Sequence, residues 1–257
     1  MITTSAEDGI ITPRKSRTDP SLGQEVLMAL TGPDLRAFTR LEGIEGSECF
    51  HLDFFKLYRH RIRGKIFPVA GPFLGAPQAA MGLEKLIALG ARRIWVLGWC
   101  GSLCPELRIG DLVVPVEGIP EEGTSQHYPA GEGGPRADPE LTGLLTGALE
   151  GRGYHYKKGA VWSTDAPFRE TPSKVKAYGE MGVLAVDMEM TALMSVALFR
   201  GVQLGGLLVV SDELFALKWH RGFHEPRFKG SLKLARGMLL ELLERPSGLE
   251  KSFEVSL

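Results

Sequence analysis

Short, continuously apolar runs alternate with segments of helical periodicity along most of this sequence. The apolar runs predict strands at 25–30, 65–71, 93–98, 111–117, 156–162, 183–187 and 206–212. The segments between them predict helices at 77–90, 138–151, 171–182, 189–200 and 229–244. Strands that are apolar on both faces and are connected by helices are typical of a central sheet covered on both sides. The sequence therefore predicts an α/β fold.

The length of 257 residues fits a single α/β domain with a large core. Residues 1–23 are rich in Thr, Ser, Pro and charged side chains, so we expect a flexible N-terminal arm there. The folded domain is expected over 24–246, with a C-terminal tail over 247–257.

Composition argues against several classes of function. A formal net charge of -1 does not favour a nucleic-acid partner, which usually needs a basic face. No apolar run approaches the roughly 20 residues of a membrane helix, and the first residues lack the apolar core of a secretory signal. Cys49, Cys100 and Cys104 fit a reducing, cytoplasmic location better than a disulfide framework. No second Cys or His pair at zinc-ligand spacing accompanies Cys100 and Cys104, so no metal is expected.

Polar residues follow several predicted strands at their carboxyl ends, which is where ligands gather in open α/β sheets. Asp212 ends an apolar run, either as a cap or turn residue or as a carboxyl whose pKa the apolar surroundings raise. Such a carboxyl donates a proton near neutral pH. Glu189 begins a helix, either as a first-turn carboxylate favoured by the helix dipole or as a bidentate acceptor for two sugar hydroxyls.

Three segments are candidates for binding through their backbone or loops. A Gly-rich turn at 98–103 could wrap N–H groups around an anion or a ring, although its spacing is not that of a dinucleotide site. The turn at 32–36 places Arg36 just inside a helix, for which a surface helix capped by Asp34 is the simpler interpretation. The polar segment 118–137 is longer than most internal loops.

Taken in order, these motifs resemble the nucleoside phosphorylase family, which includes uridine phosphorylase, hexameric purine nucleoside phosphorylase and methylthioadenosine nucleosidase. The resemblance covers about residues 25–240. The similar segments are GPDLR (32–36), GAPQAAMGLEKLIALGARRI (75–94), GWCGSL (98–103), IGDLVVP (109–115), EGTSQHY (122–128), STDAPF (163–168), VDMEM (186–190) and VVSD (209–212).

This resemblance implies a single domain with a central mixed sheet, partly barrel-like and sandwiched by helices, in a homo-oligomer that is a dimer or a hexamer. It implies cleavage of the N-glycosidic bond of a purine or pyrimidine nucleoside, with inorganic phosphate as co-substrate and no other cofactor. Asp212 matches the residue that protonates the leaving base. The remaining matches are Met188 and Glu189 for ribose, Gly32, Arg36 and Trp99 for phosphate, and Cys100, Gly101, Phe168 and Asp187 for the base.

Two positions depart from the family pattern. Val96 stands where the phosphorolytic branches carry an Arg, and Trp99 replaces a Ser or Thr that bonds phosphate. Lys218 or Arg221, in the basic and aromatic loop at 213–228, could compensate. Asp212 favours a purine-like base, whereas EGTSQHY is close to the uridine phosphorylase branch. A hydrolytic nucleosidase and a non-catalytic nucleoside-binding protein therefore remain alternatives to a phosphorylase.

Overall fold

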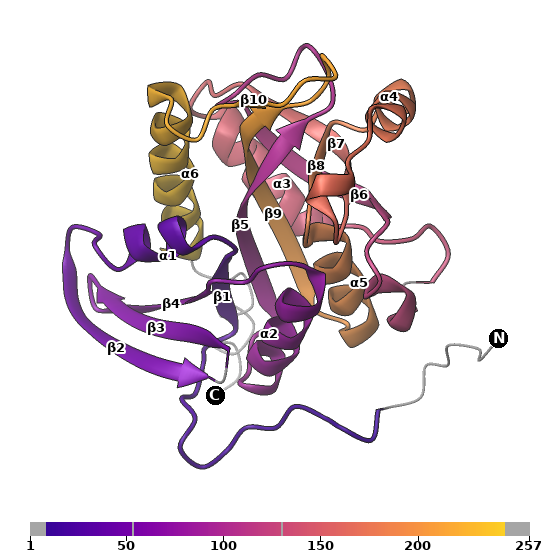
Figure 1. The fold of residues 1–257 in the computed structure, drawn as a ribbon. Coiled ribbons are helices and arrows are strands. Elements are labelled where there is room, and N and C mark those ends of the chain that lie inside the picture. The colour runs from indigo at the N-terminus through magenta and orange to yellow at the C-terminus, as the bar shows by residue number, and fades with distance from the viewer. Residues whose placement is uncertain (1–8, 53, 130, 245–257) are drawn as a thin grey trace.

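The computed structural model describes residues 9–52, 54–129 and 131–244 (Figure 1). The elements in chain order are β1 (Glu25–Ala29), α1 (Gly32–Phe38), β2 (Ile44–Leu52), β3 (Phe55–Ile62), β4 (Lys65–Gly71), α2 (Ala76–Ala88), β5 (Arg93–Ser102), β6 (Leu112–Pro120), η1 (Ser125–His127), α3 (Pro139–Glu150), β7 (Tyr156–Ser163), η2 (Pro167–Arg169), α4 (Pro172–Glu180), β8 (Ala185–Asp187), α5 (Met190–Arg200), β9 (Gln203–Glu213), β10 (His220–Arg221) and α6 (Pro226–Glu244).

The strands in the described part of the chain form one mixed sheet in the order β10-β9-β6-β7-β8-β5-β1-β4-β3-β2. An additional parallel pairing of β9 with β5 closes β5, β8, β7, β6 and β9 into a five-stranded barrel. The strands β1, β4, β3 and β2 extend from this barrel as an open sheet. The prediction of an α/β fold with a partly barrel-like mixed sheet is confirmed.

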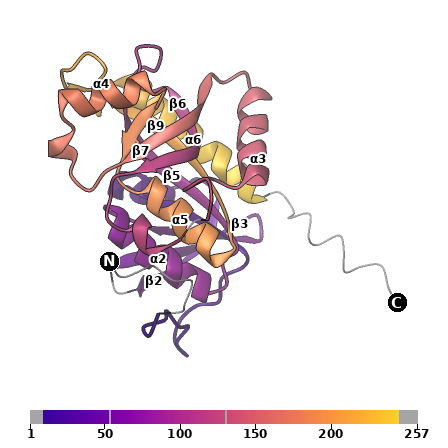
Figure 2. The ribbon, with the colours of Figure 1, turned by 90° about the vertical axis from the view of Figure 1, so that its right-hand side faces the viewer.

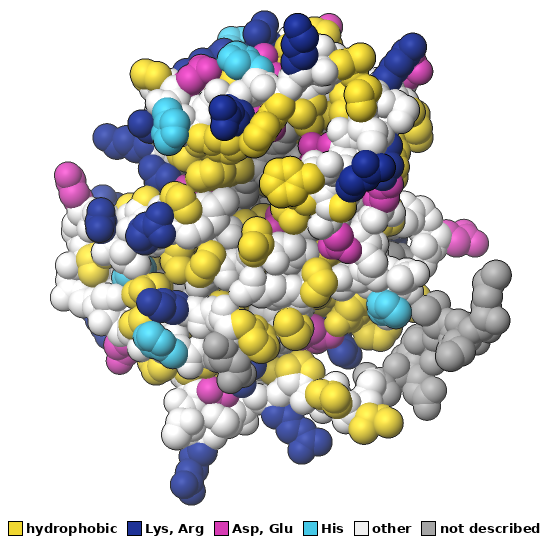
Figure 3. Space-filling view, viewed as in Figure 1, with side chains coloured by type: hydrophobic (Ala, Val, Ile, Leu, Met, Phe, Trp, Pro, Cys, Tyr) yellow, Lys and Arg dark blue, Asp and Glu magenta, His cyan; other side chains and the backbone are white. Residues whose placement is uncertain are grey.

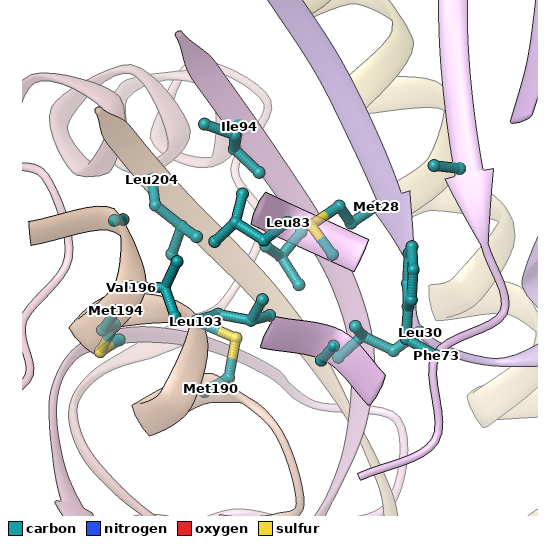
Figure 4. Close-up of a cluster of buried hydrophobic side chains, with 14 of the residues drawn as sticks. Met28, Leu30, Phe73, Leu83, Ile94, Met190, Leu193, Met194, Val196 and Leu204 are labelled. Carbon is teal, nitrogen blue, oxygen red and sulfur yellow. The ribbon is translucent and has the colours of Figure 1, made fainter. Parts of the chain in front are cut away.

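Alternate residues of the central strands pack against helices on opposite sides of the sheet. Met28 and Ile94 belong to a core shared with α2 and α5, which lie together in Figure 2 and whose side chains are drawn in Figure 4. Leu27 and Trp95 belong to a second core, with α1, α3 and α6. Burial on both sides is the reason why these strands read as continuous apolar runs.

The hairpin of β2 and β3 was not anticipated from the sequence. These strands pair antiparallel from Ile44 with Ile62 to Leu52 with Phe55, and β2 is exposed along most of its length. An exposed strand needs no apolar run, so the pattern that marks buried strands misses it.

The prediction of a Gly-rich turn at 98–103 is wrong, because β5 continues to Ser102. At Gly98 a Cβ atom would lie 2.7 Å from Leu30 Cδ1 and 2.9 Å from Leu208 Cδ2. The glycine therefore serves close packing of the strand between its neighbours rather than a change of chain direction.

Part of the expected arm and the whole expected tail, residues 1–8 and 247–257, lie outside the described residues. The described portion of the arm, residues 9–23, contains neither helix nor strand. It is attached to α2, where the Lys85 ammonium donates to Asp19 Oδ2 at 2.7 Å. Within the described ranges, no helix combines the length and the apolar character that a membrane span requires.

Candidate active site

A cavity of about 640 Å³ lies at the carboxyl ends of β1, β5, β8 and β9. In Figure 3, hydrophobic side chains surround a hollow near the centre of the face in view. Most of the residues singled out from the sequence line this cavity, although they come from distant parts of the chain: Gly32, Trp99, Cys100, Gly101, Phe168, Asp187, Met188, Glu189 and Asp212.

Asp212 is the penultimate residue of β9, and both of its carboxylate oxygens accept hydrogen bonds. The Ser211 hydroxyl is 2.6 Å from Oδ1, and the Trp219 indole nitrogen is 2.9 Å from Oδ2. Burial raises the pKa of Asp212, and these two hydrogen bonds oppose the rise. A Cβ atom on Gly101 would lie 3.2 Å from Oδ2, so the glycine keeps the space beside the carboxylate open.

Glu189 precedes the first residue of α5 and is 7% exposed. Its Oε1 accepts a hydrogen bond of 2.7 Å from the backbone N–H of Gly75, at the start of α2. Burial and the neighbouring Asp187 carboxylate raise the pKa of Glu189 to about 8. The structure therefore holds this carboxyl group firmly against two helix ends, in an environment that disfavours its charge.

Asp187 ends β8 and organises the turn into α5. Its Oδ1 accepts from the Ser163 hydroxyl and from the backbone N–H groups of Glu189 and Met190, at 3.0 and 3.1 Å. Its Oδ2 is buried without a hydrogen-bond partner. Burial raises the pKa of Asp187 to about 6. Asp187 therefore caps the turn into α5 through Oδ1, and its Oδ2 has no hydrogen-bond partner among the described residues.

The turn at 31–36 is built around a buried carboxylate. Thr31, and not Asp34 as expected, is the N-cap of α1. The Asp34 carboxylate accepts from the Thr31 hydroxyl at 2.8 Å, the Trp99 indole at 2.7 Å and the Arg236 guanidinium at 2.8 Å. The indole N–H of Trp99 therefore faces Asp34. The Trp99 ring packs against the rings of Phe223 and Phe228 at centroid distances of 6.0 and 5.1 Å.

Two residues considered for phosphate binding lie outside the cavity lining. Arg36 is exposed, with its Nη1 atom 3.2 Å from the position that a Cβ atom on Gly32 would take. Val96, which stands where the family pattern has an Arg, is fully buried in the hydrophobic core and is not among the cavity-lining residues. The contribution of Arg36 to phosphate binding therefore remains a prediction, and the side chain at position 96 points into the core.

Several cavity residues were missed or misjudged from the sequence. Glu170 follows η2, and burial together with the Asp212 charge raises its pKa to about 7. The loop at 213–228 contributes Trp219 and Phe223 to the lining, whereas the basic residues expected to act there, Lys218 and Arg221, are not among the lining residues. The aromatic residues of that loop are the sequence signal that indicates its place in the cavity wall.

The segment 118–137 does not contribute to the cavity lining. Its conformation is held by Glu122, whose carboxylate accepts from the backbone N–H groups of Thr124 and Ser125 and from the Thr191 hydroxyl. The EGTSQHY motif therefore stabilises the attachment of this loop to α5.

The electrostatic character of the cavity is acidic and aromatic. Of the residues that line it, all within the described ranges, Glu170, Asp187, Glu189 and Asp212 carry carboxyl groups and none is Lys, Arg or His. Burial raises the pKa of the Cys100 thiol far above its usual range, so this part of the wall is neutral. Elsewhere too, the described residues form no cluster of three or more His, Cys, Asp or Glu that could hold a metal ion.

Comparison with known proteins identifies the family. Residues 26–245 match the model of the Phosphorylase superfamily. The chain belongs to this superfamily. Guanosine phosphorylase of Halorubrum lacusprofundi is 28% identical over 162 residues, which are 63% of this chain and 67% of that protein. A DeoD-type purine nucleoside phosphorylase of Bacillus thuringiensis is 30% identical over 155 residues, 60% of this chain and 66% of that protein, so the chain spans about two thirds of these relatives.

Solved structures of phosphorylases share the fold of this superfamily member. Purine nucleoside phosphorylase from Toxoplasma gondii in complex with immucillin-H superposes with a TM-score of 0.76 at 21% identity, covering 91% of this chain and 96% of that one. Uridine phosphorylase from Vibrio fischeri superposes with a TM-score of 0.74 at 22% identity, covering 86% and 92%. The predicted resemblance to nucleoside phosphorylases in fold is confirmed.

Proposed function

We propose that this protein cleaves the N-glycosidic bond of a nucleoside. The observation that carries the proposal is that Glu189 and Asp212, which lie on different elements, line one cavity. A nucleoside has a diol at one end and a heterocycle that must leave at the other. The two carboxyl groups supply an acceptor for the first and a proton donor for the second.

The chemistry of the reaction gives each group a role. Glycosidic cleavage passes through an oxocarbenium-like transition state, in which the sugar becomes positive and the base departs with the bonding electron pair. A proton from Asp212 would neutralise the base, and general acids of this kind contribute about 10²–10⁴-fold in rate. Glu189, with Met188 beside it, would bind the ribose hydroxyls, and its ionised form, which its raised pKa of about 8 favours at alkaline pH, would place negative charge near the developing cation.

The acidic lining favours a base that donates hydrogen bonds. Glu170 and Asp212 both line the cavity, and the Asp212 charge helps to raise the pKa of Glu170. The unpaired Oδ2 of Asp187 is a further acceptor. Carboxylates accept N–H groups, so we propose an amino-substituted purine rather than uracil as the base. Cys100, Gly101 and Phe168, which is 94% exposed at the cavity margin, would complete the base subsite.

Phosphate is the proposed acceptor of the pentose, giving a pentose 1-phosphate. The support is the turn that contains Gly32 and Arg36, next to Trp99, and the activity stated in the names of the relatives. Water is a second candidate, favoured by the four carboxyl groups of the lining and by the buried Asp34 carboxylate beneath the turn, because these charges repel a divalent anion. A homo-oligomer remains part of the proposal.

The test is incubation of the full-length protein with guanosine, adenosine, inosine and uridine, with and without inorganic phosphate. Release of a purine base with formation of pentose 1-phosphate supports phosphorolysis, and release of free pentose without phosphate supports hydrolysis. Tight binding of nucleoside with no base release under either condition would instead identify a non-catalytic binding protein and refute the enzymatic proposal.

A further inference from the structure

Trp219 belongs to a short hairpin that folds back over the end of β9. It directly precedes β10, in which Arg221 pairs with Asp212 and His220 pairs with Glu213. Glu213 fixes the base of the hairpin, because it accepts from the Arg108 guanidinium at 2.9 and 3.1 Å and from the backbone N–H of Ile109 at 3.0 Å. Trp219 itself is 56% exposed and lines the cavity. The hairpin is therefore anchored, while the indole of Trp219 is exposed to solvent and lines the cavity.

The two side chains that donate hydrogen bonds to Asp212 differ in whether they can also accept a proton from it. The Ser211 hydroxyl, 2.6 Å from Oδ1, also lies 3.2 Å from the backbone carbonyl oxygen of Cys100. It can turn its proton to that carbonyl and accept a proton from Asp212 instead. The indole N–H of Trp219, 2.9 Å from Oδ2, can only donate. When Ser211 accepts a proton from Oδ1, Oδ2 is a carbonyl oxygen that still accepts from Trp219, so both bonds are compatible with either form of Asp212. The Trp219 N–H binds a charged carboxylate more strongly than a neutral acid, so this bond favours the ionised form.

We propose that Trp219 is a positioning residue that holds the Asp212 carboxylate in the empty cavity and releases it when the base of a nucleoside enters. Asp212 then takes a proton from water and delivers it to the base as the glycosidic electron pair moves to that base. The carboxylate that this step leaves behind is bound again by Trp219 when the product departs. This inference rests on the proposed function and assigns a loop residue to the control of its acid.

Another charged group near Asp212 also favours the protonation of Asp212. The Glu170 carboxyl, which follows η2, lies close enough to Asp212 for their charges to interact. An ionised Glu170 favours a protonated Asp212. The Cys100 thiol of β5 stays neutral, because burial raises its pKa far above its usual range. The guanidinium of Arg221, the cross-strand partner of Asp212, lies over the Trp219 ring at 5.1 Å from its centroid. Loss of the indole contact removes the N–H donor from Asp212 Oδ2.

The test compares Trp219→Phe with a matched control, Trp95→Phe. Both substitutions keep an aromatic ring and remove an indole N–H that is bonded to a carboxylate, but Trp95 is buried in the core and donates to Glu25 at 3.1 Å. The titration of Asp212 is followed by ¹³C NMR of labelled carboxyl groups in the ligand-free protein, with Asp212→Asn to assign the signal. We expect the Asp212 titration to move up by about 0.5–1 pH unit in Trp219→Phe, the size expected for a partly exposed hydrogen bond to a charged group, and to stay in place in Trp95→Phe.

The pH profiles of turnover supply a second readout. The alkaline limb of kcat/KM reports the acid in the free enzyme, whereas that of kcat reports it in the substrate complex. Because Trp219 has already released Asp212 in the complex, Trp219→Phe should shift the limb of kcat/KM upward and leave the limb of kcat in place. An unmoved Asp212 titration, or an equal shift of both limbs, would overturn the proposal. The titration needs no substrate, so an unmoved Asp212 signal overturns the proposal even if no nucleoside is cleaved, whereas the comparison of kcat/KM with kcat tests the release itself.

Discussion

The substitution Glu189→Gln should both stabilise the protein against unfolding and inactivate it. The pKa of Glu189 is raised from 4.5 to about 8, because the site removes the carboxyl from water and places it beside Asp187. Between these two values the folded protein keeps a proton that the unfolded chain has lost, so the free energy of unfolding falls as pH rises. Each pH unit of separation is worth about 1.4 kcal/mol, which gives an upper limit of about 4–5 kcal/mol above pH 8.

A glutamine has no charge to desolvate, and its amide oxygen can still accept the N–H of Gly75. We therefore expect Glu189→Gln to differ from the wild type by less than about 1 kcal/mol at pH 5 and to be more stable by about 3 kcal/mol at pH 7. Urea denaturation at pH 5, 7 and 8.5 measures this. The ionised form of Glu189 would make two charge-assisted hydrogen bonds to the ribose that the variant lacks, so kcat/KM should fall by about 10²-fold or more above pH 8, where Glu189 is ionised.

Glu84→Gln is the matched control. Glu84 is also 7% exposed, but the guanidinium of Arg200 binds both of its oxygens at 2.9 and 3.0 Å. Removing this paired carboxylate should destabilise the protein at neutral pH, the opposite sign from Glu189→Gln. The interpretation that the site disfavours the charge of Glu189 is refuted by either of two results. One is that Glu189→Gln is no more stable than the wild type at pH 8.5. The other is that its gain in free energy of unfolding is the same at pH 5 as at pH 8.5.

Three further substitutions test other parts of the site. Asp212→Asn should lower kcat/KM for ordinary nucleosides by about 10²–10⁴-fold. It should leave unchanged the kcat/KM for substrates whose base is already cationic and departs without a proton. Steady-state kinetics with both types of substrate measures this difference. Gly101→Ala should raise KM with little change in melting temperature, because its Cβ atom would lie 3.2 Å from Asp212 Oδ2 and narrow the cavity; an unchanged KM would place the base elsewhere. Asp34→Ala should reduce the free energy of unfolding by about 3–5 kcal/mol in urea denaturation, because Arg236 and the Trp99 indole lose their acceptor; a loss below 1 kcal/mol would speak against that network.

The sequence predicts those parts of the fold and site that follow from local patterns. Strands buried on both faces appear as apolar runs, and a polar residue that ends such a run, such as Asp212, falls at the sheet edge where ligands bind. Glu189 is found for the same reason, since it stands two residues after the end of β8 and directly before α5. In both cases the position of the residue on its strand or helix fixes where its side chain is placed.

The remaining features depend on long-range packing that no local pattern encodes. The exposed β2 has no apolar signature. Gly98 of β5 looks like part of a turn because its close neighbours, Leu30 and Leu208, are distant in sequence. Trp219 reaches Asp212 only because β10 pairs with the end of β9. Glu170 likewise has no motif of its own, and its raised pKa depends on its burial and on the Asp212 charge that folding brings near it.

The account is tested most directly by a crystal structure of the protein with a C-nucleoside, whose carbon–carbon glycosidic bond resists cleavage. We predict that the ligand occupies the cavity at the ends of β5 and β9, with its ribose diol within hydrogen-bond distance of Glu189 and a ring nitrogen facing Asp212. A complex in which the sugar lies away from Glu189, or in which the heterocycle does not approach Asp212, would contradict the assignment of this cavity as a site of glycosidic cleavage.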